Sequence, residues 1–457
     1  MKTTRRSFLK SALTLGGAAV AFPTIIPSTV LGRNGKVAPS NRVCMAFIGT
    51  GNQGTGDMSN FLRDRRVQVV AVCDVNRESD GYWDNAIGGR EPARRRVNDF
   101  YAQGRDSGVY NGCAVYADFR PMIERPDIDA VEVATPDHWH ALLSVEAMKA
   151  GKAVYCQKPL SLTVSDGRAI ADAARKYGAV FQCGSQQRSE RNFRLACEYV
   201  LNGGIGKLET VECGLPGGWA DYGKTAQFKA TTPVPDGLNY DFWLGPAPEA
   251  PYCKARVGVN FRWVMDYSGG QLTDWGGHHP DIAQWGMGTE LTGPVEILNA
   301  VGKVPEDPVY NTLTEFRYDC VYENGVRMTI ANDLRGGVTF KGTDGTVWVN
   351  RGGLETKNKA GEKVDLYELD EENFKVKLYQ SDNHYRNFID CIYTGRECIA
   401  PAEVAHRSIT LSHLGNIAIA LKASKLKWDP EKEQFMGNDD ANKMLKREYR
   451  KPWVLSV

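Results

Sequence analysis

The chain has 457 residues, of which 42% are hydrophobic and 24% are charged, and its formal net charge is +1. This length exceeds that of one ordinary hydrophobic core, so we expect two domains. Because the near-neutral charge provides no basic excess to neutralise phosphates, the composition argues against nucleic acid as the main partner.

The first residues have the pattern of an export signal. Arg5 and Arg6 precede the tetrapeptide SFLK, a short apolar run follows, and AVA at 19–21 fits a cleavage site. We therefore predict a twin-arginine signal over residues 1–21 and a periplasmic or otherwise exported protein, with an ordinary secretory signal as the alternative. The Pro-, Gly- and Ser-rich stretch at 22–40 is predicted to be a linker. No later apolar run approaches the ~18 residues of a membrane span.

Apolar runs of strand length then alternate with helix-compatible stretches. The runs lie at 43–49, 67–74, 130–136 and 153–159. One of the intervening stretches, at 140–151, has the composition of a helix. Strands and helices that alternate at this spacing predict βαβ units and a buried parallel sheet. We therefore expect a Rossmann nucleotide-binding domain over residues 41–160.

The hexapeptide GTGNQG at 49–54 follows the first of these strands and has the pattern G-x-G-x-x-G. Glycines suit this turn because the backbone must approach a pyrophosphate closely, and the next helix offers free N–H groups to the phosphates. Asp74 ends the second strand, where a carboxylate binds the adenosine ribose and repels a 2′-phosphate. We therefore predict NAD as the cofactor, with NADP as the less favoured alternative because Arg77 is nearby. The predicted nucleotide contacts in this part are Gly49, Gly51, Asn52, Gln53, Gly54 and Asp74.

Three further stretches carry polar side chains of catalytic type. ATPDHWHA at 134–141 and CQKPLS at 156–161 follow buried strands, where ligands bind in open α/β sheets. The third stretch, GGQLTDWGGHHPD at 269–281, contains Asp274, His278, His279 and Asp281. These four residues could form an acid/base pair, a metal site or a polar turn. Adjacent histidines do not match common zinc spacings, so we expect no metal.

After about residue 185 the pattern changes to frequent Trp, Tyr and Gly with shorter strand-like runs. Asn324–Gly325, inside such a run, predicts a hairpin. Residues 402–424 read as one long helix. The expected fold class is α/β: an N-terminal Rossmann domain, then a C-terminal α/β domain over 161–457 with a large, mostly antiparallel open sheet.

Together these motifs resemble the Gfo/Idh/MocA family of sugar and polyol oxidoreductases. The family's Glu-Lys-Pro is present as Gln157, Lys158 and Pro159, and its D-x-x-x-H pair matches Asp274 and His278. The resemblance implies that Lys158 contacts both the substrate hydroxyl and the nicotinamide region, and that Asp274 and His278 transfer a proton. Gln157 departs from the family's glutamate. Further residues expected to contact the cofactor are Thr135, Pro136, His138, His140, Gln157 and Lys158.

These residue types suit the oxidation of a carbinol. A histidine near its ordinary pKa accepts the hydroxyl proton, a neighbouring carboxylate orients the ring, and a lysine cation favours the alkoxide. Arg262 is a candidate for binding sugar hydroxyls, and aromatic side chains either stack on sugar rings or belong to the core. The expected substrate contacts are Arg262, Trp263, Tyr267 and His279.

We therefore predict an exported, NAD(P)-dependent oxidoreductase that oxidises a secondary hydroxyl of a sugar or glycoside, with a 3-keto glycoside as one concrete product. Free NAD is scarce outside the cytoplasm, so we expect a tightly bound cofactor that a second substrate recycles. One alternative is a redox-neutral glycoside hydrolase of the N-acetylgalactosaminidase-like branch, although Lys158 favours the dehydrogenase. Another is a non-catalytic sugar- or nucleotide-binding protein. The resemblance also implies a homo-oligomer.

Overall fold

The computed structural model describes residues 37–457. The export signal predicted at residues 1–21 lies outside the described residues, as does most of the linker predicted at 22–40. Within residues 37–457, the strands form two sheets, one of six strands and one of nine.

The first sheet is entirely parallel, with the strand order β3-β2-β1-β4-β5-β6. Its strands are β1 (Val43–Ile48), β2 (Val67–Cys73), β3 (Ala114–Tyr116), β4 (Ala130–Val133), β5 (Ala153–Cys156) and β6 (Phe181–Cys183). The strands are apolar on both faces because helices cover both sides. Strand β6 extends this sheet beyond the domain boundary predicted at residue 160, since the chain crosses over once more before it leaves the sheet.

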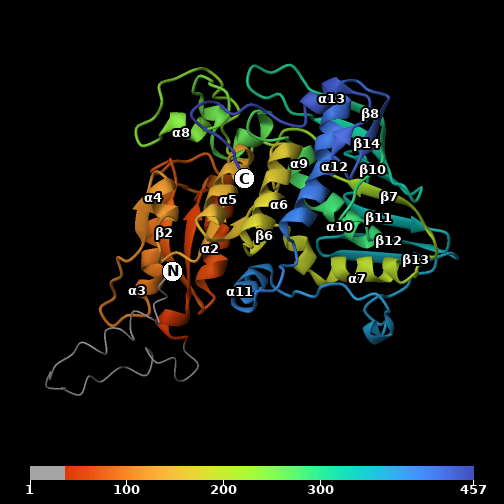
Figure 1. Ribbon diagram of the computed structural model, residues 1–457, viewed down its shortest axis with the longest axis horizontal. Helices are drawn as coiled ribbons and strands as arrows, with labels where there is room; N and C mark the ends of the chain where they lie inside the picture. The colour runs from red at the N-terminus through yellow and green to blue at the C-terminus, as the bar shows by residue number, and fades with distance from the viewer. Residues whose placement is uncertain (1–36) are drawn as a thin grey trace. The chain divides into compact units, whose positions relative to one another are not determined.

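Helices pack on the two faces of the first sheet (Figure 1). The α-helices of this N-terminal domain are α2 (Asn52–Leu62), α3 (Arg90–Ala102), α4 (Arg120–Ile123), α5 (His140–Lys149) and α6 (Val164–Tyr177). Helix α6 shows why its ends fall where they do. The Thr163 hydroxyl accepts the Asp166 N–H at its start, and Gly178 adopts a left-handed conformation at its end.

The second sheet has the order β13-β12-β11-β7-β10-β9-β8-β14-β15 and is mostly antiparallel, as predicted; β7 and β10 form a parallel pair. Its strands are β7 (Leu208–Gly214), β8 (Glu296–Lys303), β9 (Glu315–Val321), β10 (Arg327–Ala331), β11 (Gly337–Gly342), β12 (Gly345–Asn350), β13 (Gly353–Asn358), β14 (Lys425–Asp429) and β15 (Gln434–Phe435). The predicted hairpin joins β9 and β10, and Gly325 in its turn has a φ of 85°.

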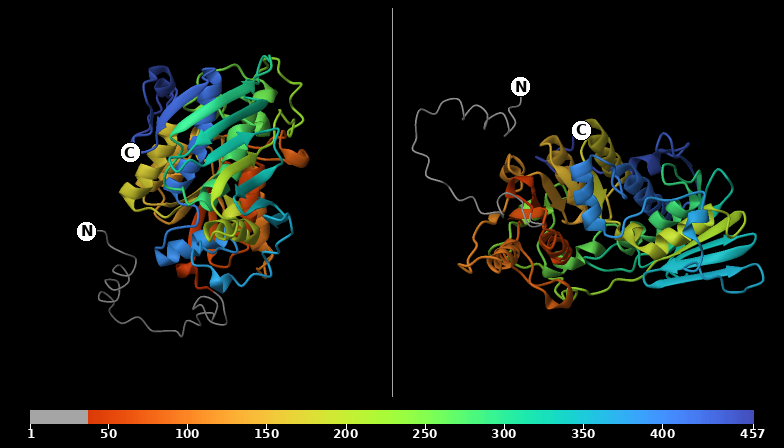
Figure 2. Two further views of the ribbon diagram at one scale, coloured as in Figure 1. Left: turned by 90° about the vertical axis from the view of Figure 1, so that its right-hand side faces the viewer. Right: turned by 90° about the horizontal axis from the view of Figure 1, so that it is seen from below.

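One face of the second sheet is covered by three helices, α7 (Arg191–Leu201), α10 (His279–Met287) and α12 (Ala402–Ala420). The other face lies open in Figure 2, and its strands alternate buried and exposed side chains, as in β9. Helix α12 is shorter than the 402–424 predicted, because the chain turns after Leu421 to enter β14. The remaining α-helices of the described residues are α8 (Tyr240–Leu244), α9 (Gln271–Gly276), α11 (His384–Thr394) and α13 (Asp439–Lys443).

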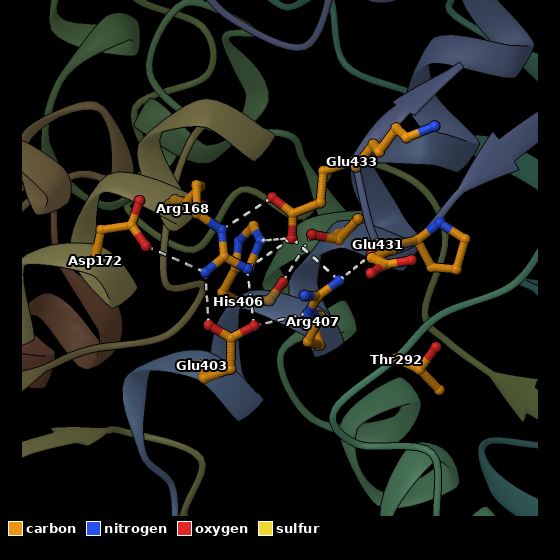
Figure 3. A network of polar contacts seen from close by, with 12 residues as sticks. Arg168, Asp172, Thr292, Glu403, His406, Arg407, Glu431 and Glu433 are labelled. Atoms are coloured by element: carbon orange, nitrogen blue, oxygen red, sulfur yellow. Dashed lines mark hydrogen bonds and ion pairs between the residues drawn. The ribbon is translucent and has the colours of Figure 1, made fainter. Parts of the chain in front are cut away.

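An ion-pair network joins α6, α12 and the turn between β14 and β15 (Figure 3). The Arg168 guanidinium lies 2.6 Å from Glu403 and 2.7 Å from Glu433. Glu433 also lies 2.7 Å from His406 Nε2, and Arg407 lies 2.8 Å from Glu403. The network therefore fastens the last sheet strands to helices of both domains.

All eleven cysteines lie within the described residues, and the ten other than Cys44 are buried and free. None of the helices in residues 37–457 has the length and apolar character needed to cross a membrane.

Candidate active site

The turn between β1 and α2 brings the backbone close to neighbouring segments. Gly49 has a φ of 86°, and a Cβ there would lie 2.6 Å from the Ala134 carbonyl oxygen. A Cβ on Gly54 would lie 2.0 Å from the Gly49 oxygen, so this glycine permits close packing of the helix start. The turn leads directly into α2, whose first N–H groups are free for phosphates. This geometry fits the pyrophosphate of a dinucleotide.

Asp74 lies beside this turn, at the end of β2. Its carboxylate accepts the Thr50 and Asn76 N–H groups, each at 2.8 Å, and retains further acceptor capacity. Burial raises the pKa of Asp74, and these hydrogen bonds oppose that shift. Arg77 is exposed and does not line the cavity described next, so the geometry favours a free ribose over a 2′-phosphate.

A cavity of about 480 Å³ runs from this turn to the second domain. Its wall includes ten residues predicted from the sequence: Gly49, Gly51, Asn52, Gln53, Asp74, Thr135, Pro136, Gln157, Lys158 and Arg262. Gly54 does not line it, because it packs against the Gly49 oxygen and the Ala134 side chain. One continuous space therefore joins the glycine-rich turn to Lys158.

The segment 75–89, which we call the cover segment, folds over the glycine-rich turn. The Tyr82 ring packs so closely that a Cβ on Gly51 would lie 2.7 Å from it. The Trp83 N–H donates to the Asn52 side chain at 2.7 Å, and the Gly89 N–H donates to the Thr50 oxygen at 3.0 Å. Both Tyr82 and Trp83 line the cavity. None of the sequence motifs predicted a role for this segment.

The cover segment is also fastened to the second domain. The Arg77 N–H donates to Gly237 at 2.8 Å, and the Val259 N–H donates to Gly81 at 2.9 Å. Lys254 forms an ion pair with Asp80 at 2.8 Å. A nucleotide in the cavity would therefore lie beneath a segment held from both sides.

The C-terminal tail supports another wall of the cavity. The Trp453 ring lies 4.8 Å from Trp139, 5.1 Å from Phe242 and 6.5 Å from Phe119, measured between ring centroids. These three rings line the cavity, whereas Trp453 lies behind them. The Arg450 guanidinium holds the tail by donating to the Gly245 oxygen at 3.0 Å.

Lys158 forms the centre of a charged cluster at the far end of the cavity. Its Nζ lies 2.9 Å from Asp274 Oδ1, and Arg262 Nε lies 3.4 Å from the same oxygen. Burial raises the pKa of Asp274, but the two cations outweigh burial and hold that pKa below its ordinary value. Lys158 and Arg262 line the cavity and Asp274 does not. The carboxylate therefore orients the two cations from outside the wall.

Gln157 connects Lys158 to a buried acidic pair. Its amide donates to Asp57 and accepts the Lys158 N–H at 3.1 Å. Tyr385 also donates to Asp57, at 2.6 Å. Burial raises the pKa values of Asp57 and Glu132, and the Asp57 charge raises that of Glu132 further, so Glu132 is the carboxyl that stays protonated beside Asp57. A glutamate at position 157, as in the family motif, would add a third carboxyl here, which gives a physical reason for the glutamine.

His278, the predicted proton acceptor, is buried and does not line the cavity. Its ring lies 5.8 Å from the Trp275 ring, and its Nδ1 is buried without a hydrogen-bond partner. Burial lowers its pKa well below the ordinary value, and the charges of Lys158 and Arg351 add to that effect. The carboxylate predicted to orient this ring, Asp274, pairs with Lys158 instead because the cation offers the stronger interaction.

His138 and His140 were predicted to contact the cofactor, but neither side chain lines the cavity. Both rings lie beside backbone carbonyl groups instead. His138 Nε2 lies 3.1 Å from the Trp243 oxygen. His140 lies between the Pro159 and Thr135 oxygens, at 2.8 and 2.9 Å, so it holds together the two segments that contribute Thr135 and Lys158 to the cavity wall. Burial lowers the pKa of His138 to about 3 and lowers that of His140.

Three predicted substrate contacts belong to the core. Trp263 is 1% exposed and its indole N–H donates to the Ala220 oxygen at 3.0 Å. Tyr267 is fully buried, with its ring 4.8 Å from that of Trp243. His279 Nδ1 lies 2.9 Å from the Gly214 oxygen. These side chains face inward because large aromatic groups gain most from burial.

The rival metal site does not form from the residues at 274–281. Asp281 accepts two hydrogen bonds from the buried Arg188 guanidinium, at 2.7 and 2.9 Å. Asp274 is paired with Lys158. Across residues 37–457, no group of three or more His, Cys, Asp and Glu side chains could hold a metal ion.

Asp137 lines the cavity beside the charged cluster and was not predicted as a site residue. It is 4% exposed, and its Oδ2 is buried without a hydrogen-bond partner. Its place directly after Thr135 and Pro136, at the carboxyl end of β4, is the signal that could have identified it.

Comparison with known proteins assigns the family. Residues 43–185 match the model of the Gfo/Idh/MocA oxidoreductase family, NAD-binding Rossmann fold, and residues 214–455 match the C-terminal alpha/beta domain of the same family. The chain therefore belongs to the Gfo/Idh/MocA oxidoreductases, and its N-terminal half is an NAD-binding domain.

Proteins of related sequence match only part of the chain. A glycosyl hydrolase family 109 protein from Shewanella baltica is 29% identical over 188 residues, which are 38% of this chain and 37% of that protein. Levoglucosan dehydrogenase from Pseudarthrobacter phenanthrenivorans is 36% identical over 92 residues, 20% of this chain and 24% of that enzyme. The chain thus matches less than two fifths of the length of these relatives.

Solved structures share the fold at low sequence identity. An aldose-aldose oxidoreductase from Caulobacter crescentus, complexed with glycerol, has a TM-score of 0.57 at 20% identity and covers 84% of this chain and 99% of its own. A levoglucosan dehydrogenase in complex with NADH has a TM-score of 0.58 at 18% identity, with coverages of 84% and 99%. These matches establish the two-domain fold.

Proposed function

We propose that the protein is an NAD-dependent oxidoreductase that oxidises a secondary hydroxyl of a sugar or glycoside. The observation that carries this proposal is the single cavity that joins the glycine-rich turn and Asp74 to Lys158 and Arg262. A 3-keto glycoside is one concrete product. The named relatives that act on sugars support the carbohydrate class of substrate.

The side chains at the far end of the cavity have the properties that this oxidation needs. Bound NAD would supply the hydride acceptor. Lys158, oriented by Asp274 at 2.9 Å, presents an ammonium group that stabilises developing alkoxide charge on the substrate oxygen. Arg262, held by the same carboxylate, offers donors to neighbouring hydroxyls.

We further propose that the nucleotide is retained through many turnovers. The cover segment closes the glycine-rich turn with Tyr82 and Trp83 and is bonded to Gly237 and Val259 of the second domain. Release would therefore require these contacts to break. Retention suits the proposed export, because folded proteins passing through the twin-arginine route carry their cofactors with them.

The first experiment is to purify the protein without added cofactor, denature it and identify the released nucleotide by mass and absorbance. We expect close to one NAD or NADH per chain. A panel of glycosides and free sugars is then followed at the NADH absorbance band. An empty protein that also fails to bind added NAD would overturn the proposal.

The role of Lys158 is tested by Lys158→Met, which keeps the side-chain length and removes the charge. We expect kcat to fall by about 10²–10³-fold while nucleotide content stays near one per chain. Lys149→Met is the matched control, because that lysine lies in α5 and pairs with Glu146. Equal activity of Lys158→Met and wild type would exclude the proposed role.

A second candidate function is redox-neutral glycoside hydrolysis, which is favoured by the similarity to family 109 glycosyl hydrolases. The two functions differ in their products. A hydrolase would release free sugar from a nitrophenyl glycoside without any second substrate and without net change in NADH. The proposed oxidoreductase would form a keto sugar only when an acceptor is present.

Export and assembly are also proposals. We infer that residues 1–21 direct twin-arginine export, which is tested by replacing Arg5 and Arg6 with lysine and measuring the protein in the periplasmic fraction. We infer a homo-oligomer that uses the open face of the second sheet, which light scattering on the mature protein tests. A monomer at all concentrations would exclude it.

A further inference from the structure

The cavity wall contains several carboxyl groups with different surroundings. Among the described residues that line it, the carboxyls are Asp74, Glu78, Asp80, Asp137 and Asp236. Glu78, Asp80 and Asp236 are exposed. Asp74 is held by the Thr50 and Asn76 N–H groups. Asp137 differs from all of these because it is buried and its Oδ2 has no hydrogen-bond partner.

Asp137 lies among the charges of the cluster at the far end of the cavity. Burial raises its pKa to about 7, and Asp274 contributes in the same direction. The nearby Ser268 hydroxyl and the charges of Arg262 and Lys158 oppose that rise. The group can therefore both gain and lose a proton near neutral pH, which suits an acid/base catalyst.

The other ionisable groups at this end of the cavity are poor proton acceptors. Lys158 is an ion-paired ammonium and Arg262 is a guanidinium, so both carry donors only. Asp274 is occupied by these two cations, and His278 does not line the cavity. Asp137 is the carboxyl that a substrate hydroxyl beside Lys158 would meet.

We propose that Asp137 is a further catalytic residue, which accepts the hydroxyl proton of the substrate. This inference rests on the proposed function. The O–H bond breaks and its proton passes to an Asp137 oxygen as the C=O bond forms; bound NAD⁺ would supply the acceptor for the hydride that the same carbon gives up. The acceptor sugar later takes up the hydride and the proton, so each pair of half-reactions leaves Asp137 ionised again.

The first test measures protonation without turnover. Infrared difference spectra of the NADH-loaded protein, recorded between pH 5 and 9, are expected to show a buried carboxylic acid band that disappears with a midpoint near 7. The band is expected to be absent in Asp137→Asn and present in Asp236→Asn, which removes an exposed carboxylate from the same cavity wall. The buried carboxyls of Asp57 and Glu132 are unchanged in both variants, so a band that keeps its full amplitude and its midpoint near 7 in Asp137→Asn would overturn the assignment.

The second test uses the pH dependence of kcat. The wild-type rate is expected to fall as the pH drops below 7, because protonated Asp137 cannot accept a second proton. Asp137→Asn is expected to lower kcat by about 10²–10⁴-fold and to lose this acid limb, with nucleotide content unchanged. Asp137→Glu keeps the carboxyl and is expected to restore the limb at a lower rate.

The outcomes separate this inference from the function on which it rests. A wild type that oxidises no sugar would overturn both proposals. A wild type that turns over, with an Asp137→Asn variant that keeps its rate and acid limb, would overturn only the role of Asp137. If His278→Gln instead lost the acid limb and Asp137→Asn kept it, His278 would be the proton acceptor.

Discussion

Asp74 and Asp137 both follow a strand of the first sheet, yet their surroundings give them different chemistry. Asp74 accepts two backbone N–H groups, which leave it suited to hold a ribose. Asp137 has a buried oxygen with no partner, so it can change its protonation state. The difference arises from the backbone nearby, because the turns after β1 and β2 direct the Thr50 and Asn76 N–H groups at the Asp74 carboxylate.

The role of Asp74 leads to a prediction on cofactor choice. Asp74→Asn replaces a charged acceptor by a neutral amide that also carries donors. Because hydrogen bonds to charged groups contribute about 1.5–3 kcal/mol, we expect NAD to bind about tenfold more weakly or worse, with the preference over NADP reduced.

Calorimetry on protein freed of nucleotide measures both affinities. Asp106→Asn changes an exposed carboxylate outside the cavity and is expected to leave them unaltered. Unchanged NAD affinity in Asp74→Asn would show that this carboxylate does not contact the ribose.

Sequence patterns could locate the backbone of the site better than its side chains. Gly49, Asp74 and Lys158 sit at strand ends, and a strand end fixes which part of the sheet a residue reaches. The direction of His140 or Tyr267 depends on which carbonyls and rings the folded chain places nearby, and local sequence does not contain that information. Asp137 was missed for the same reason, since its burial depends on segments more than 100 residues away.

At the level of elements, the network of Arg168, Glu403, Glu433, His406 and Arg407 joins α6 and α12 to the β14–β15 turn (Figure 3). Its carboxylates are only partly exposed, so their pairing is less screened than that of surface ion pairs. Arg168 of α6 and Glu403 of α12 are 235 residues apart in the chain, so their ion pair connects two helices that are distant in sequence.

This network predicts a loss of stability in acid. Burial raises the pKa of Glu403, but Arg168 and Arg407 outweigh it and lower that pKa from 4.5 to about 2. Because the pKa of Glu403 is lower in the folded state, its ionised carboxylate stabilises the fold fully above about pH 4.5. This stabilisation is lost as the pH falls toward 2 and the carboxylate takes up a proton. After allowance for solvent screening, we expect about 1–2 kcal/mol.

The measurement is the free energy of unfolding in urea at pH 7 and pH 4, for wild type and Glu403→Gln. The variant is expected to be less stable at pH 7 and to depend less on pH across this interval. Glu124→Gln, at an exposed position in the first domain, serves as the control. Equal pH dependence of Glu403→Gln and wild type would contradict the prediction.

The C-terminal tail is a second element with a testable role. Trp453 packs against three rings that line the cavity, so Trp453→Ala is expected to lower stability by about 2 kcal/mol and to weaken nucleotide retention. Thermal unfolding and the NAD content after purification measure the two effects. Val454→Ala, at a side chain that is 70% exposed, is the control. Full retention of NAD in Trp453→Ala would show that the tail is not needed for the cavity wall.

The sequence predicts which segments form helices and strands better than it predicts the residues at which they end. The parallel strands are continuous apolar runs, and Asn324–Gly325 is a strong turn signal, so both could be identified. The end of α12 depends on β14 pairing with β8, which is a contact between distant segments. The position of β6 in the first sheet depends in the same way on its pairing with β5.

On the scale of the whole molecule, Arg188 and Asp281 join the two domains through a buried ion pair. Arg188 lies after β6 and Asp281 lies in α10; both side chains are 2% exposed. Ser408 of α12 also donates to Asp281, at 2.7 Å. Three elements from different parts of the chain therefore meet at one fully enclosed carboxylate.

We expect Arg188→Met to destabilise the protein by about 3–5 kcal/mol, because it leaves the Asp281 charge buried without its partner. The double variant Arg188→Met/Asp281→Leu is expected to recover much of this loss. Urea unfolding measures both. Arg191→Met removes an exposed ion pair with Glu371 and is expected to cost about 1 kcal/mol or less. A double variant no more stable than Arg188→Met would contradict the explanation.

The cover segment is fastened to both domains, so a protein that keeps its nucleotide would have to admit its two substrates in turn. The donor product would leave before the acceptor enters the same space beside Lys158. Reciprocal plots of initial rate against donor concentration, taken at several acceptor concentrations, are then expected to be parallel lines. The rate is also expected to survive gel filtration without added NAD, as it does in enzymes whose redox group is a permanent part of the protein.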